Sequence, residues 1–353
     1  MTWLILVILA VLVVAIYPVV RDFLRKRRSA VPAYVEGLQA ALDGRTADAI
    51  ARLKETVGTD SDNVDAYIRL GDLFMQQGEV ERAIKVHENL ALRRNLDKRE
   101  EKKVLQALVR DYVKTDRKVK AISLLEELVH LDKNDAASSE RLAELYIETG
   151  AWDKCEEQLK ELARHQAQRQ RAARLYTEYG HAYPKDNPGA ALAAFETALK
   201  LDPSSIPARL YLGDHQLSQG DTNAAIKTWN DLLDLAPDKN ALVRDRLERA
   251  YFDAGKFEDI TTIYEKLLRK VPDDSGLVVA LAEIYQKKED LSSAIRLLER
   301  YAGKQTADVL PRVALATMYL DREENDRARA VLAEVLSALQ PESPGPGYPR
   351  RPA

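Results

Sequence analysis

The feature that most constrains the fold of this chain is a pair of positions that recurs with a near-constant period. A small residue, or once an isoleucine, is followed four residues later by a large one, so both lie on one face of a helix. The pairs are Ala49/Leu53, Ala83/His87, Ala121/Leu125, Cys155/Leu159, Ala191/Phe195, Ala225/Trp229, Ile260/Tyr264, Ala294/Leu298 and Ala328/Leu332. Successive first members lie 34 to 38 residues apart. The chain is therefore predicted to be an array of helical units and not a single globular core.

A period near 34 is typical of tetratricopeptide repeats (TPRs), in which each unit is a helix–turn–helix. Gly71, Gly213 and Ala143 stand upstream of the pairs, where a small residue lets two antiparallel helices approach closely. We expect the large residue to fill the gap between neighbouring units. Glycines stand between the two helices of a unit, where a left-handed residue ends the first helix: Gly78, Gly150, Gly220 and Gly255. The prediction is an all-α TPR solenoid of about nine helix-turn-helix repeats over residues 34–339.

The first twenty residues have a different composition from the repeats. They contain no charged side chain, and Thr2 to Val20 is just long enough to cross a bilayer as a helix. Arg21 and the run Arg25 to Arg28 follow, and positive charge beside a span favours the cytoplasm. We expect a single transmembrane helix over residues 1–20, a basic juxtamembrane linker over 21–33, and cytoplasmic repeats. A cleaved signal peptide is the alternative, but it requires basic residues before the apolar run and a small-residue cleavage site.

Composition argues against several functions. The 53 Lys+Arg and 56 Asp+Glu give a net charge of −3, so there is no bulk attraction to nucleic acid. One cysteine, Cys155, and five scattered histidines predict no disulfide and no metal site. No phosphate-binding, zinc-protease or nucleophile-elbow motif occurs, so we expect neither an enzyme nor a bound cofactor. Five prolines after residue 340 predict a disordered tail over 340–353.

Several chemically reactive side chains occupy packing positions of the repeat. Cys155 takes a small position and His87 a large one, so a buried thiol and a core histidine are the favoured interpretations over a nucleophile or a ligand. Tyrosines recur at one place in their units, which predicts core residues and not a platform for stacking bases: Tyr112, Tyr146, Tyr251, Tyr285 and Tyr319.

The remaining candidate for function is the surface formed by the first helix of each unit, which lines the concave face of a TPR array. The candidate partner-binding groove comprises Asp65, Ile68, Asp72 and Met75 in the second unit, Lys103, Gln106, Arg110 and Lys114 in the third, and Glu140, Glu144 and Glu148 in the fourth. We expect all of them to be exposed, with charge alternating along the groove. The basic patch of the third unit could hold an acidic segment of a partner, or it could be a merely solvated face.

Part of the chain resembles a known family. The residues that carry the resemblance are Tyr34-Val35-x-Gly37-Leu38, the run Ala66 to Phe74, the run Gly78 to His87, and Arg110-Asp111-Tyr112. With the apolar start and the basic block, they are similar to the lipopolysaccharide assembly protein B family. The later units resemble it only as general TPRs.

The resemblance implies a single-pass inner-membrane adaptor whose repeats face the cytoplasm. It implies protein partners, namely the deacetylase that commits lipid A synthesis and the membrane protease FtsH. That family also ends in a rubredoxin-like zinc module held by two C-x-x-C pairs, and with one cysteine this chain is expected to lack it. The alternative is a TPR scaffold that serves another inner-membrane complex. An enzyme or a periplasmic binding protein is the third interpretation, and the least favoured.

Overall fold

The computed structural model describes residue 17 and residues 31–184, 187–303 and 308–339. Apart from Tyr17, the predicted anchor (residues 1–20) lies outside these residues, as do most of the basic linker and the whole tail (340–353). Within the described residues, no helix has both the length and the apolar character that a membrane span requires.

The described residues form nine consecutive helix pairs, which we number as repeats 1 to 9, and they contain no strand. The pairs are residues 31–42 with α2 (Thr46–Thr59), α3 (Val64–Gln76) with α4 (Val80–Ala91), α5 (Lys98–Lys114) with α6 (Lys118–Leu131), α7 (Ala136–Thr149) with α8 (Trp152–Arg164), α9 (Arg169–Ala182) with α10 (Pro188–Leu201), α11 (Ile206–Ser218) with α12 (Thr222–Leu235), α13 (Arg244–Asp253) with α14 (Phe257–Lys270), α15 (Ser275–Lys287) with α16 (Leu291–Ala302), and α17 (Leu310–Asp321) with α18 (Asn325–Leu339). Two short 3₁₀ helices, Gln166–Gln168 and Pro237–Leu242, precede α9 and α13. The all-α repeat prediction is confirmed.

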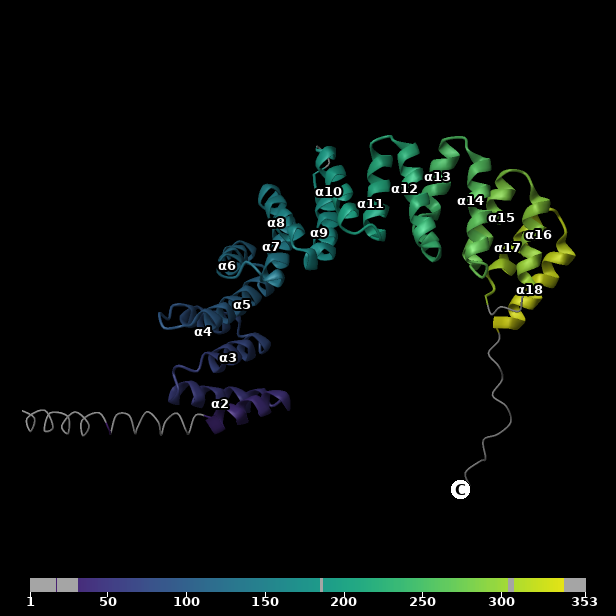
Figure 1. Ribbon diagram of the computed structural model, residues 1–353. Helices are drawn as coiled ribbons and strands as arrows, with labels where there is room; N and C mark the ends of the chain where they lie inside the picture. The colour runs from purple at the N-terminus through teal and green to yellow at the C-terminus, as the bar shows by residue number, and fades with distance from the viewer. Residues whose placement is uncertain (1–16, 18–30, 185–186, 304–307, 340–353) are drawn as a thin grey trace, which may run out of the picture. The chain divides into compact units, whose positions relative to one another are not determined.

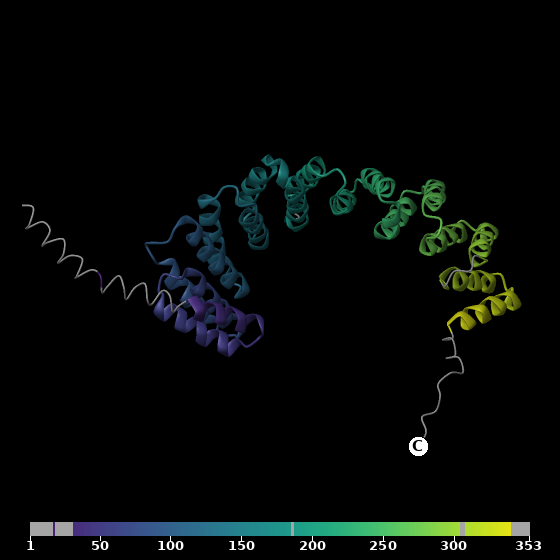
Figure 2. The same ribbon diagram turned by 60° about the horizontal axis from the view of Figure 1, so that its bottom comes forward.

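The chain divides within α9 into two compact units, one ending at Leu175 and one beginning at Tyr176. In each unit, successive helices lie side by side, as Figure 1 and the turned view in Figure 2 show. The extra residues between the second and third repeats fall in the loop after α4 and in α5, which has 17 residues where α3 has 13.

The recurring pairs form the packing centre of every repeat. All nine first members are buried, and so are eight of the nine large residues; the exception is Leu332 on α18, which no further described helix covers and which is 38% exposed. The structure adds that, at Gly71 and Gly213, the large residue of the same repeat packs directly on the glycine of the first helix. A Cβ built on Gly71 would lie 2.6 Å from Cε1 of His87, and one on Gly213 would lie 2.6 Å from Cδ1 of Trp229. Glycine therefore makes room for these rings.

The turns between paired helices confirm the expected left-handed residues. Gly78, Gly150, Gly220 and Gly255 have φ values between +67° and +84°. In three other repeats the turn residue with a positive φ is acidic instead of glycine, namely Asp116, Glu289 and Glu323. A side chain with a Cβ is strained in this region, so these three turns store conformational energy that the glycine turns do not.

The five recurring tyrosines each link their own repeat to the one before it. Their hydroxyls donate hydrogen bonds of 2.5 to 2.6 Å to a glutamate on the preceding second helix: Tyr112 to Glu88, Tyr146 to Glu126, Tyr285 to Glu265 and Tyr319 to Glu299. Tyr251 instead accepts a hydrogen bond from Asn230. The rings are buried, or half-buried at Tyr285, which confirms their prediction as core residues.

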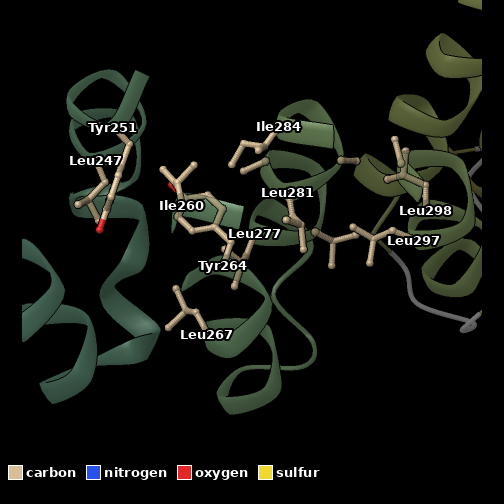
Figure 3. Packing of buried hydrophobic residues seen from close by; sticks show 14 of the residues in the cluster. Leu247, Tyr251, Ile260, Tyr264, Leu267, Leu277, Leu281, Ile284, Leu297 and Leu298 are labelled. Atoms are coloured by element: carbon tan, nitrogen blue, oxygen red, sulfur yellow. The ribbon is translucent and has the colours of Figure 1, made fainter. Parts of the chain in front are cut away.

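The core of the second unit shows the same packing at close range (Figure 3). Tyr264 and Ile260 of α14 lie between Leu247 of α13 and Leu277 of α15, and all four side chains are at most 1% exposed. The layer continues through Leu281 toward Leu298 of α16. In this part of the second unit, each helix pair thus buries its apolar side against the adjacent pairs, as expected for a repeat whose units contact only their neighbours.

Candidate functional site

The first helices of repeats 1 to 3 border one hollow of about 920 Å³. Its wall includes eight of the predicted groove residues: Asp65, Ile68, Asp72, Met75, Lys103, Gln106, Arg110 and Lys114. On each helix the spacings of three, four and seven residues place these side chains along one face. We call this hollow the N-terminal groove.

Five of the eight residues are less exposed than predicted: Asp65, Asp72 and Gln106 are half-buried, and two more are buried. Ile68 and Met75 are buried, at 7% and 8% exposure, so the prediction that they are exposed was wrong. Both lie on the side of α3 that turns toward the neighbouring helices as well as toward the hollow, and Ile68 belongs to a small core with Val64 and Leu90. They form the floor of the groove, whereas the charged residues form its rim.

Sequence reasoning missed the apolar end of the groove. Leu38, Ala41 and Leu42, from the helix over residues 31–42, also line it. The side chain of Leu42 is 89% exposed, which is unusual for a leucine in a helical repeat. The available signal was the apolar spacing of Leu38 and Leu42, four residues apart and on one face of the first helix pair that the structure describes.

The charges on the rim are partly matched across the helices. Arg110 lies 3.3 Å from Asp72, while Asp65 lies 3.6 Å from Arg69 and 4.0 Å from Lys103. Lys114 is exposed and forms no ion pair with any residue that the structure describes. Exposed pairs of this kind contribute little to stability, so the rim stays available to an incoming ligand.

The predicted acidic residues of repeat 4 are placed apart from this hollow. Glu140 and Glu144 accept hydrogen bonds from Arg174, at 2.6 and 2.9 Å, and Glu148 lies 3.2 Å from Lys118. Burial alone would raise the pKa of Glu144, but the hydrogen bonds from Arg141 and Arg174 hold it below its ordinary value. Glu140, Glu144 and Glu148 are therefore engaged in ion pairs of their own, and the structure does not bring them into the N-terminal groove.

A buried ion pair lies beneath the groove. Nδ1 of His87 is 2.6 Å from Oδ2 of Asp111, and Nε2 is 3.1 Å from the carbonyl oxygen of Ile68. Both facing atoms are acceptors, so the arrangement suits an imidazolium with two N–H donors. Burial lowers the pKa of His87, but the hydrogen bonds to Asp111 and Ile68 outweigh it and raise the pKa above its ordinary value. His87, expected as a satisfied core histidine, is fully buried and joins repeats 2 and 3.

The other reactive side chain also has a packing role. Cys155 is fully buried, and that burial, with a smaller contribution from Glu156, raises the pKa of its thiol to about 12. Such a thiol is protonated at neutral pH and is a poor nucleophile. Among the described residues, no three His, Cys, Asp or Glu side chains gather as the ligands of a metal would.

Comparison with known proteins identifies the repeat. The tetratricopeptide repeat family model matches residues 40–100, 119–179 and 185–246, just over half of the 353 residues. The chain belongs to the tetratricopeptide repeat family.

This TPR protein is similar to lipopolysaccharide assembly protein B. It is 23% identical to the Haemophilus influenzae protein of that name over 248 residues, which is 70% of this chain and 62% of that protein. It is also 23% identical to the Escherichia coli K12 protein over 305 residues, 85% of this chain and 77% of that protein. A crystal structure of MamA protein covers 60% of the chain at 18% identity, with a TM-score of 0.35 that is too low to bear on function.

Proposed function

We propose that this TPR protein is a membrane-anchored adaptor that holds a partner protein in its N-terminal groove and regulates lipopolysaccharide, and specifically lipid A, biosynthesis. The observation that carries the proposal is the open hollow of about 920 Å³, because eight of its lining residues come from the face that TPR proteins use for partners. The similarity to lipopolysaccharide assembly protein B, over 70 to 85% of the chain, supports the pathway.

The anchor is proposed from the sequence alone. The uncharged residues 1–20 and the basic residues that follow them support a single inner-membrane span with the repeats in the cytoplasm. A reporter fused after Leu339 tests this topology. We expect cytoplasmic β-galactosidase-type activity, and strong periplasmic alkaline phosphatase activity would contradict both the topology and the adaptor role.

The partners follow from the resemblance: the deacetylase that commits lipid A synthesis, and the membrane protease FtsH. A scaffold for another inner-membrane complex is the second candidate. It is favoured by the identity of only 23%, at which a shared repeat fold is compatible with a different partner. Co-purification of each named partner with the full-length tagged chain separates the two candidates.

A charge-reversal variant tests the groove itself. Arg110→Glu/Lys114→Glu changes two exposed side chains, so stability should change by less than about 0.5 kcal/mol per site. A partner that pairs with these cations would lose well over tenfold in affinity, since a desolvated charge pair is worth about 2–5 kcal/mol.

The matched control is Lys85→Glu/Lys227→Glu, which makes the same charge change at exposed positions of second helices, outside the groove. Circular dichroism verifies that both variants fold. Undiminished co-purification by the folded groove variant would show that the partner does not use this surface.

A further inference from the structure

The two ends of the N-terminal groove differ in chemistry. At the repeat 1 end, the lining residues Leu38, Ala41 and Leu42 are all apolar. At the repeat 3 end, the three cations Lys103, Arg110 and Lys114 all project from α5. A ligand that fills the hollow must therefore present an apolar group at one end and negative charge at the other.

The charge of the lining favours an acidic ligand. Four cations line the hollow, namely Arg69, Lys103, Arg110 and Lys114, against two half-buried carboxylates, Asp65 and Asp72. The third carboxylate, Asp111, is 2% exposed and already bonded to His87. The accessible lining of the groove thus carries a net charge of +2, and three of its four cations lie on α5.

The same lining favours a peptide over a polyphosphate. A peptide carries one N–H donor and one C=O acceptor per residue. The groove offers acceptors at Asp65 and Asp72 and donors at Gln76 and Gln106 along its length. A polyphosphate has no donors and would be repelled by the two carboxylates.

The distance across the groove sets the spacing of the two recognised groups. Neighbouring helices pack roughly 8–10 Å apart. The helix over residues 31–42 and α5 are separated by α3, so the distance between them is about 16–20 Å. An extended chain covers about 3.3–3.6 Å per residue, so this span corresponds to roughly five or six residues.

We infer that the N-terminal groove binds an extended acidic peptide segment in which a large apolar side chain and a carboxylate lie about five residues apart. The apolar side chain packs on Leu38 and Leu42, and the carboxylate pairs with Lys114 and Arg110. This inference rests on the proposed function and names the chemistry of its ligand.

Fluorescence anisotropy with the full-length chain in detergent tests the inference. The probe is a labelled ten-residue peptide with one leucine and one glutamate five residues apart in a Ser/Gly background. Its matched peptides replace the glutamate by glutamine, replace the leucine by serine, or place the two residues side by side. A ten-nucleotide single-stranded DNA of equal label tests for a general anion site.

We expect the probe to bind at least fivefold more tightly than each matched peptide, and the DNA to bind no better than the glutamine peptide. Lys114→Glu should weaken probe binding at least tenfold and Leu42→Ser at least threefold, while Lys85→Glu should leave it unchanged. Binding should also weaken as salt rises, because the pairs are exposed.

Equal binding of all the peptides, or tighter binding of the DNA, would overturn the inference. If the peptides fail while Arg110→Glu/Lys114→Glu still abolishes co-purification of a partner, the proposed function stands and only the ligand chemistry is wrong. If the charge reversal also leaves co-purification intact, the groove is not the partner site and both proposals fall.

Discussion

Gly213 of α11 and Trp229 of α12 occupy one shared space: a Cβ on the glycine would lie 2.6 Å from Cδ1 of the fully buried indole. The same exchange of volume recurs along the chain. Glycine faces a ring at Gly71/His87 and Gly180/Phe195. Opposite a leucine the equivalent residue varies: it is glycine at Gly37/Leu53 and alanine at Ala143/Leu159 and Ala282/Leu298. These repeats thus fill a similar gap between their two helices with a small residue on the first helix and a large one on the second.

Gly213→Ala is therefore expected to destabilise the protein, although alanine is the better helix former. Overpacking a filled core costs about 1–3 kcal/mol, against a gain of about 1 kcal/mol in helix propensity. The urea midpoint of unfolding should fall. Adding Trp229→Leu recreates an alanine–leucine pair, so the double variant should be more stable than the sum of the single changes predicts.

The control is Gly58→Ala, at an exposed glycine of α2 where an added Cβ meets nothing within 4 Å. It should raise stability by up to about 1 kcal/mol. Additive effects of Gly213→Ala and Trp229→Leu would mean that the two positions do not share volume.

The period of the chain was sufficient to predict the packing positions, because a position that must fit between two helices has a fixed spacing whatever residue fills it. Exposure of the groove was harder to predict. Ile68 has the spacing of a groove residue, but it also borders the next repeat, and its burial depends on how far α5 approaches. Leu332 has the spacing of a core residue, yet its burial requires a further helix. Both depend on neighbours that the pattern of a single repeat does not describe.

His87→Leu should be strongly destabilising, although leucine fits this position in other repeats. The change leaves the carboxylate of Asp111 buried without its partner, which typically costs about 3–5 kcal/mol. His87→Leu/Asp111→Leu removes both charges and should recover most of that loss. If the single and double variants have equal urea midpoints, the pair contributes nothing specific.

The same pair should make stability depend on pH. Because the folded protein raises the pKa of His87, its contribution is fully present below the ordinary histidine pKa of about 6.5 and is lost as pH rises through the folded value. Asp111 and, at longer range, Asp72 are the charges that raise it. Urea midpoints at pH 6 and pH 9 should therefore differ more for the wild type than for the double leucine variant.

Glu289→Gly is expected to stabilise the protein. Glu289 has a φ of +60°, where an L-residue is strained by about 1–2 kcal/mol, and glycine is not. The greater flexibility of glycine in the unfolded chain offsets about 0.5–1 kcal/mol of this gain. A net increase of about 0.5–1 kcal/mol in the free energy of unfolding should result. The reverse change, Gly220→Ala at a φ of +84°, should destabilise by a similar amount. A destabilising Glu289→Gly or a stabilising Gly220→Ala would contradict the strain argument.

Tyr146→Phe should lower stability by about 1 kcal/mol. The change removes the hydrogen bond of 2.6 Å that the hydroxyl donates to Glu126, while the buried ring stays. Hydrogen bonds from Lys154 and Tyr146 lower the pKa of Glu126, so its contribution is present above the ordinary glutamate pKa and is lost as pH falls through the lowered value. The loss of stability caused by Tyr146→Phe should accordingly shrink between pH 7 and pH 3.

Tyr67→Phe is the control, because the half-buried Tyr67 hydroxyl has no hydrogen bond to a residue that the structure describes. Equal effects of the two phenylalanine variants would show that the tyrosine–glutamate bond does not hold neighbouring repeats together.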